Sequence, residues 1–157
     1  MDLGGYETDW VTRLSTNLDD LSPEITGAVM DKLFAVGALD VWFTPIQMKK
    51  NRPAVELSVL CEESSTGVMA EVIFLETSAF GLRMEKMARL KLERRFESVE
   101  TEFGEVTVKL GLRGGEVIQV APEFASCQAA SERTGKALRF IYAAAVQGYT
   151  RANGRGG

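Results

Sequence analysis

Histidine is absent from this sequence of 157 residues, and cysteine occurs only twice, at Cys61 and Cys127. Imidazole and thiolate are the usual ligands of zinc, nickel and copper, so two isolated cysteines exclude the common sites for these metals. Catalysis that depends on a histidine base is excluded as well. A metal held by the side chains of this chain therefore needs oxygen ligands, which favour magnesium or manganese.

Long apolar runs and an excess of positive charge are also missing. No apolar stretch reaches the roughly 18 residues of a membrane-spanning helix. The sequence has 18 Lys and Arg residues and 22 Asp and Glu residues, which gives a net charge of -4. The N-terminus has no basic and apolar leader, and the two cysteines are typical of buried free thiols. We therefore expect a cytoplasmic protein that binds neither membranes nor nucleic acid.

The apolar pattern of the first ninety residues predicts alternating strands and helices. Strands are expected at 10–16, 38–46, 55–61 and 82–92, and helices at 22–36 and 65–76. This is the order of a ferredoxin-like split βαβ unit, an α+β fold with both helices on one face of an antiparallel sheet. Trp42, Ile46 and Leu60 then lie on the opposite, bare face, where later segments or a partner chain must cover them.

The remaining residues predict a second, smaller set of elements. A hairpin is expected around Gly104, then a short strand, a helix from Pro122 to near Gly135 and a helix at 137–148. We divide the chain into an N-terminal extension (1–9), a core (10–93), the hairpin with its two helices (94–149) and a disordered tail (150–157).

The most informative segment surrounds the start of the first predicted helix. Asp19, Asp20 and Glu24 lie within six residues, and Ser22 and Pro23 are typical of a helix N-cap and first turn. One acid is enough to complement the helix dipole. More acids than that indicate a divalent cation, which at a helix start indicates bound phosphate. The alternative is a solvated acidic loop.

A basic turn separates the second and third predicted strands. It contains Lys49, Lys50, Asn51 and Arg52. Such a turn can clamp phosphate oxygens, or it can simply be solvated. In a split βαβ unit we expect this turn at the end of the sheet opposite the acidic loop, so a shared site would require two subunits or a bent strand.

A third segment joins the second helix to the fourth strand. Thr77, Ser78 and Gly81 precede Arg83 there. These residues can form an ordinary turn or present donors to an anion, with Arg83 as a second phosphate ligand. Glu123, near the start of a later helix, is a weaker candidate whose ordinary role is to complement the helix dipole.

Four segments together resemble the C-terminal domain of the LarC family of nickel insertion proteins. They are TNLDDLSPE at 16–24, TPIQMKKNRP at 44–53, ETSAFGLR at 76–83 and VAPE at 120–123. The resemblance covers 10–149. It implies CTP-dependent insertion of nickel into pyridinium-3,5-bisthiocarboxylic acid mononucleotide, which completes the nickel-pincer cofactor of lactate racemase. CTP is then hydrolysed to CMP and pyrophosphate, and the C-terminal domain binds CTP with a divalent metal and forms homo-oligomers.

The resemblance and the residues together suggest roles for the polar segments. We expect Asp19 and Asp20, with Glu24, to hold Mg²⁺ or Mn²⁺ on the triphosphate. The expected phosphate and polar contacts are Lys49, Lys50, Asn51, Arg52, Thr77, Ser78 and Arg83. The nickel contacts are expected in the N-terminal half of the family's full protein, or on the sulfurs of the substrate. The alternatives are a non-catalytic assembly module and a nucleotide sensor without turnover.

Overall fold

The computed structural model describes residues 4–154. The chain divides into two compact units, which are described separately. The N-terminal unit is residues 8–89, and the C-terminal unit is residues 90–154 together with 4–7. No helix within 4–154 is long and apolar enough to cross a membrane.

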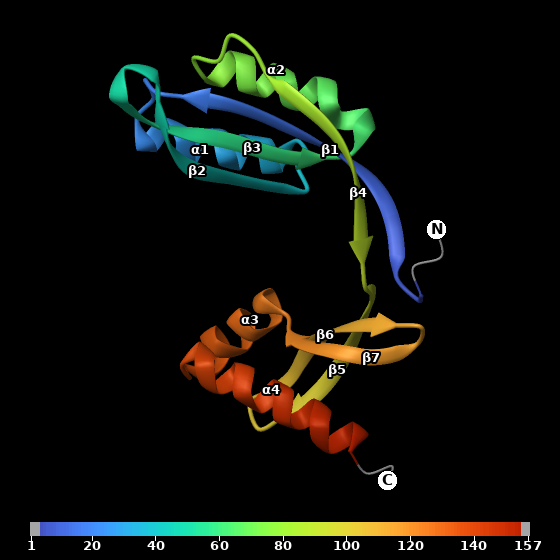
Figure 1. Ribbon diagram of the computed structural model, residues 1–157. Helices are drawn as coiled ribbons and strands as arrows, with labels where there is room; N and C mark the ends of the chain where they lie inside the picture. Colours follow the sequence, from blue (N-terminus) through green and yellow to red (C-terminus); the bar gives the residue numbers. More distant parts are fainter. Residues whose placement is uncertain (1–3, 155–157) are drawn as a thin grey trace. The chain divides into compact units, whose positions relative to one another are not determined.

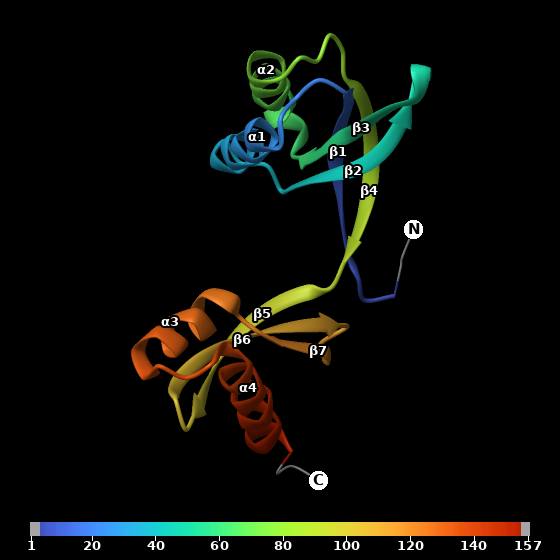
Figure 2. The same ribbon diagram turned by 90° about the vertical axis from the view of Figure 1, so that its left-hand side faces the viewer.

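The N-terminal unit consists of a four-stranded sheet with two helices on one face (Figures 1 and 2). Its strand order is β2-β3-β1-β4, with β3 antiparallel to both β1 and β2. The elements follow the predicted order along the chain. They are β1 (Glu7–Leu18), α1 (Pro23–Ala35), β2 (Asp40–Met48), β3 (Arg52–Cys61), α2 (Thr66–Glu76) and β4 (Arg83–Lys91), with short 3-10 turns at Lys49–Asn51 and Glu63–Ser65.

The core of this unit lies between the helices and the sheet. The alternation of β3 is confirmed, since Leu57 is fully buried, and Leu33 and Ile73 anchor the two helices. Leu14 and Leu18 of β1 join them, as do Val29, Val41, Val59, Cys61 and Met69. The helical spacing of α1 predicts a wider inward face than the structure shows, because Ile25 and Val36 are 45% and 40% exposed. The alternation predicted for β4 does not give a buried face, because Met84 and Leu90 are 66% and 50% exposed. Of the apolar residues alternating from Leu82 onward, only Leu82 itself, just before β4, packs against the core of this unit.

The opposite face of the sheet is more polar than expected. Trp42, Ile46 and Leu60 are half-buried rather than bare. The Arg13 guanidinium lies 5.8 Å from the centre of the Trp42 ring and shields part of that surface. Ser58 on the same pleat is fully buried. Polar side chains of the sheet therefore cover part of the face that was predicted to need later segments or a partner chain.

The C-terminal unit is a three-stranded sheet, in the order β5-β6-β7, that packs against two helices (Figure 1). The elements are β5 (Glu93–Thr101), β6 (Gly104–Arg113), β7 (Glu116–Pro122), α3 (Phe124–Thr134) and α4 (Leu138–Asn153). The predicted hairpin is confirmed, because Thr101 pairs with Gly104, whose φ of 93° suits glycine. Its core contains Val106, Val108, Leu110, Leu112, Cys127, Ala130, Ile141 and Ala145. Both cysteines of the protein are buried free thiols, as predicted.

Helix α4 continues past the predicted end at Gly148. It runs to Asn153, so residues 150–153 are helical rather than a disordered tail; 155–157 lie outside the described residues. Glycine usually ends a helix, which is why the prediction stopped there. In the structure Gly148 instead lets α4 approach β5. A Cβ at this position would lie 2.5 Å from Val99 Cγ1 and 2.9 Å from the Glu100 carbonyl oxygen.

We expect Gly148→Ala to lower the free energy of unfolding by about 1–3 kcal/mol, because the added methyl group overpacks this contact. Gly27→Ala on α1 is the matched control, because its Cβ would meet nothing within 4 Å. That variant should gain up to about 1 kcal/mol from helix propensity. Urea unfolding of both variants shows whether each substitution raises or lowers the free energy of unfolding. Equal effects of the two substitutions would contradict the close packing of α4 on β5.

Candidate functional site

Three polar segments of the N-terminal unit meet at one end of its sheet. β1 and β2 are both antiparallel to β3, so they run in the same direction and both end where β3 begins. The pairing of Leu18 with Val55 places the end of β1 beside the β2–β3 turn (Figure 1). The prediction that the acidic loop and the basic turn lie at opposite ends of the sheet was therefore wrong. One chain brings both segments together.

Two contacts define this end of the sheet, and we call their four residues the loop cluster. An Arg52 NH group donates to Asp19 Oδ2 at 3.0 Å. The Ser78 hydroxyl donates to Asp20 Oδ1. Arg52 and Asp19 are 58% and 24% exposed, so solvent screens this ion pair and it contributes little to stability. The cluster therefore has charged groups available for a ligand.

The start of α1 is built as the sequence predicts. Ser22 is the N-cap, and its hydroxyl accepts from the Ile25 amide at 3.4 Å, with Pro23 at the first helical position. Glu24 lies exposed in the first turn. Because Ser22 performs the capping, neither Asp19 nor Asp20 is needed for it.

The loop between α2 and β4 is fastened to the rest of the unit. The Thr77 hydroxyl donates to the Ile73 carbonyl at 2.6 Å and accepts from the Ala79 amide at 3.1 Å. The Thr16 hydroxyl of β1 donates to the Gly81 carbonyl at 2.9 Å. Thr77 thus shapes the loop, and Ser78 is the hydroxyl that reaches the loop cluster.

The basic turn has an unusual backbone. Lys50 and Asn51 both have φ of 60°, in the left-handed region that non-glycine residues seldom adopt. Two consecutive residues with positive φ match the twist of a tight hairpin. The side-chain amide of Gln47 donates from Nε2 to Asn51 Oδ1 at 2.9 Å and helps to fix the turn. Lys49 and Lys50 remain exposed beside Arg52.

Arg83 lies on the open face of the sheet in a network that the sequence did not reveal. Its Nε donates to Ser15 Oγ at 3.0 Å, and a terminal NH group donates to Asn17 Oδ1 at 2.8 Å and Glu56 Oε1 at 3.0 Å. Arg13 donates to the same Glu56 oxygen at 3.2 Å. Glu56 therefore holds two guanidinium groups in place. It had no motif around it, and only the pairing of Asn17 with Glu56 brings it there.

The carboxylates do not form a ready-made metal cage. Within residues 4–154, no group of three or more His, Cys, Asp and Glu side chains gathers closely enough to hold a metal ion. Asp19 and Asp20 are two hard oxygen donors. Their number fits a magnesium or manganese ion that takes its remaining ligands from phosphate and water.

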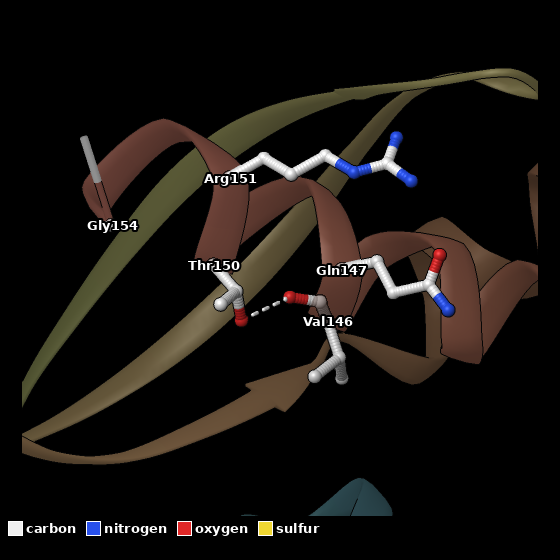
Figure 3. Close-up of a pocket in the computed structure, with 5 residues that line it drawn as sticks. All are labelled: Val146, Gln147, Thr150, Arg151 and Gly154. Atoms are coloured by element: carbon white, nitrogen blue, oxygen red, sulfur yellow. Dashed lines mark hydrogen bonds between the residues drawn. The ribbon is translucent and has the colours of Figure 1, made fainter.

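A hollow lies elsewhere, along the end of α4. It has a volume of about 490 Å³ and is lined by Val146, Gln147, Thr150, Arg151 and Gly154 (Figure 3). The Thr150 hydroxyl is bonded to its own helix, at the Val146 carbonyl. Among the residues that the structure describes, Arg151 is the only charged side chain that lines this hollow, and none of the predicted site residues does. The loop cluster is therefore the better candidate site.

The family model for nickel insertion proteins matches residues 2–142. The chain belongs to this family. It is 45% identical over 131 residues to the pyridinium-3,5-bisthiocarboxylic acid mononucleotide nickel insertion protein of Clostridium acetobutylicum, covering 83% of this chain and 31% of the relative. The protein of the same name from Thermotoga petrophila is 39% identical over 141 residues, 90% of this chain and 36% of the relative. The chain thus spans about a third of the curated relatives it matches.

Solved structures agree with this assignment. One is LarC2, the C-terminal domain of a cyclometallase involved in the synthesis of the NPN cofactor of lactate racemase, in its apo form. Its TM-score is 0.86 at 36% identity, over 91% of this chain and 99% of that one. A protein from Methanopyrus kandleri gives 0.66 at 27% identity, over 92% and 91%. The chain therefore corresponds to the C-terminal domain of LarC, and the predicted resemblance is confirmed.

Proposed function

We propose that this chain is the CTP- and divalent-metal-binding, oligomer-forming half of a cytoplasmic nickel insertion protein. The complete protein would place nickel, as a substrate, into pyridinium-3,5-bisthiocarboxylic acid mononucleotide and hydrolyse CTP to CMP and pyrophosphate. The observation that carries the proposal is the loop cluster, where two carboxylates, an arginine and a hydroxyl converge from three segments. The strand order and the alternation of elements support a ferredoxin-like unit beneath it.

The charges of the loop cluster suit a metal-bound triphosphate better than a free anion. Asp19 and Asp20 would repel phosphate oxygens directly, whereas a divalent ion between them reverses that repulsion. When bound, this ion supplies charge neutralisation and a template for the phosphates. Glu24, exposed in the first turn of α1, does not gather with Asp19 and Asp20 into one metal-binding group and would reach the ion only by moving. The carboxylates would therefore hold the ion and, through it, the nucleotide.

The basic side chains would take the phosphate oxygens that remain. Arg52 forms an ion pair with Asp19, so a phosphate must compete for its guanidinium. A released Asp19 is then available to the metal. Lys49 and Lys50 are exposed next to it and supply two further positive charges. Together they stabilise the charge that gathers on pyrophosphate as it leaves.

The other proposed ligands have less freedom. Ser78 can donate to a phosphate only by leaving Asp20, while Asn51 and Thr77 are already bonded within their turns. Arg83 is 54% exposed and retains donors that its contacts with Ser15, Asn17 and Glu56 do not use. We therefore propose Arg83 as a fixed, pre-oriented positive charge at the edge of the site.

Nickel itself would be handled outside this chain's own side chains. The sequence has no histidine, and its two cysteines are buried. Burial raises the pKa of the Cys61 and Cys127 thiols, which opposes the thiolate form that binds nickel. The N-terminal half of the full protein and the substrate's sulfurs would therefore provide the nickel ligands.

An assembly module is the second candidate function. It is favoured by apolar side chains on the outer surface of the helices: Phe34 is 45% exposed, Phe74 46% and Leu75 76%. Such side chains can be buried when copies of the chain associate. On this alternative, the loop cluster has no ligand.

Isothermal titration of the whole chain with CTP and Mn²⁺ tests the proposal. We expect a saturable heat that disappears when EDTA removes the ion, because the two acids then repel the triphosphate. Mn²⁺ alone and CTP alone are the controls. The absence of any binding heat for CTP with Mn²⁺ would reject the nucleotide function and leave the assembly module.

A further inference from the structure

Phe80 is fully solvent-exposed, with a relative accessibility of 105%. The next most exposed large apolar side chain of the described residues is Leu75, at 76%. A phenylalanine in this environment contributes no packing to the fold, although it could bury a large apolar area against a ligand. The stability of the N-terminal unit therefore does not explain why a phenylalanine occupies this position, whereas binding of a ligand does.

The exposure does not come from a loose loop. On one side of Phe80, the Ala79 amide donates to Thr77 Oγ1 at 3.1 Å. On the other side, the Gly81 carbonyl accepts from the Thr16 hydroxyl at 2.9 Å. The first bond closes a turn within the loop, where Ala79 also packs against the core, and the second ties Gly81 to β1. The exposed ring therefore lies between two backbone positions that are held in place.

That position is next to the loop cluster. Ser78, which donates to Asp20, lies two residues before Phe80. Two peptide links limit the distance between their Cα atoms to about 7 Å. The ribose of a nucleotide separates its base from its first phosphate by a comparable length. A nucleotide with its phosphates at the loop cluster can therefore reach the Phe80 ring with its base.

We infer that Phe80 is a stacking platform for the base of the nucleotide. This inference rests on the proposed function and adds a base contact to the phosphate and metal contacts. Aromatic stacking depends on the π-face that every base possesses, so it tolerates different bases. Phe80 should therefore raise the affinity for nucleotides in general, and selectivity for cytosine must come from other groups.

Titrations of the whole chain with two ligands in the presence of Mn²⁺ test the inference. CTP has phosphates and a base, whereas inorganic tripolyphosphate has phosphates alone. We expect Phe80→Ala to lower the affinity for CTP about tenfold, as the loss of one base–aromatic stack does. The affinity of this variant for tripolyphosphate should stay unchanged. Phe80→Trp should bind CTP as tightly as the wild type does, and Asp20→Asn should lower the affinity for both ligands.

Leu75→Ala, at another exposed apolar residue, is the matched control and should change neither affinity. The inference is overturned if Phe80→Ala leaves CTP affinity intact, or weakens CTP and tripolyphosphate equally. It is also overturned if Phe80→Ala only reduces the oligomer size in size-exclusion chromatography, which would make Phe80 part of a protein interface. If the wild type binds neither ligand, the proposed function fails with it. Binding of tripolyphosphate as tightly as CTP rejects the base contact alone.

Discussion

The double variant Asp19→Asn/Asp20→Asn is expected to lose at least about a hundredfold in affinity for CTP in the presence of Mn²⁺. In the proposed site each carboxylate would make a charge-assisted contact with the ion, and each such contact would contribute about 1.5–3 kcal/mol. The loss of two contacts therefore exceeds the roughly 2.7 kcal/mol that a hundredfold change represents. Isothermal titration measures the affinity, and size-exclusion chromatography should show an unchanged oligomer.

The sign of this effect separates a metal site from a plain anion site. Removal of two negative charges from the loop cluster also frees Arg52 from its ion pair with Asp19. Without a metal, both changes favour a triphosphate, so the variant should bind CTP more tightly than the wild type does in EDTA. Weaker binding with Mn²⁺ and tighter binding without it is the pattern that only a carboxylate-bound ion produces.

Asp31→Asn/Glu71→Gln is the matched control. It makes the same change in net charge at exposed positions of α1 and α2, outside the loop cluster. We expect its CTP affinity to remain within a factor of about two, because salt screens the interaction between exposed charges that do not contact the ligand. If the Asp19/Asp20 variant bound CTP with Mn²⁺ as the control does, the assignment of these acids to the metal would be wrong.

Leu33→Ala should destabilise the chain by about 3 kcal/mol. Leu33 is fully buried in α1, among the residues that join the helices to the sheet. Truncation of a buried leucine removes its transfer free energy and leaves a cavity, at a combined loss of about 2–5 kcal/mol. Urea unfolding, followed by circular dichroism, gives the change in the free energy of unfolding.

Leu75→Ala makes the same chemical change at a side chain of α2 that is 76% exposed. Its expected effect lies within about 0.5 kcal/mol of zero, because little apolar surface leaves or enters water. The difference between the two variants measures burial alone, without a difference in residue type. A loss below about 1 kcal/mol for Leu33→Ala would contradict the core described above.

Local sequence signals predicted the local structure. Ser22 and Pro23 predicted the start of α1 correctly, because a cap and a first turn involve residues only a few positions apart. The alternation of Leu57, Val59 and Cys61 marked the buried face of β3 for the same reason. Gly148 shows the limit of such signals. A glycine that ends a helix and one that admits a neighbouring strand look alike in a sequence.

The acidic loop, the basic turn and the 76–83 loop were each recognisable as polar segments rich in phosphate-binding residue types. The sequence did not show that these segments converge, because their convergence depends on the direction of β1 and β2 relative to β3. Glu56, which anchors Arg13 and Arg83, was missed because its partners are 43 and 27 residues away.

The sequence by itself determined the order of the elements, the inward face of β3, the polar segments and the family resemblance. Only the tertiary structure decided that Asp19 contacts Arg52, that Asp20 contacts Ser78 and that Phe80, two residues after Ser78, is exposed. The physical reason is the range of the interactions. Caps and periodicity act over a few residues, whereas strand pairing joins residues tens of positions apart and so sets which side chains share one site.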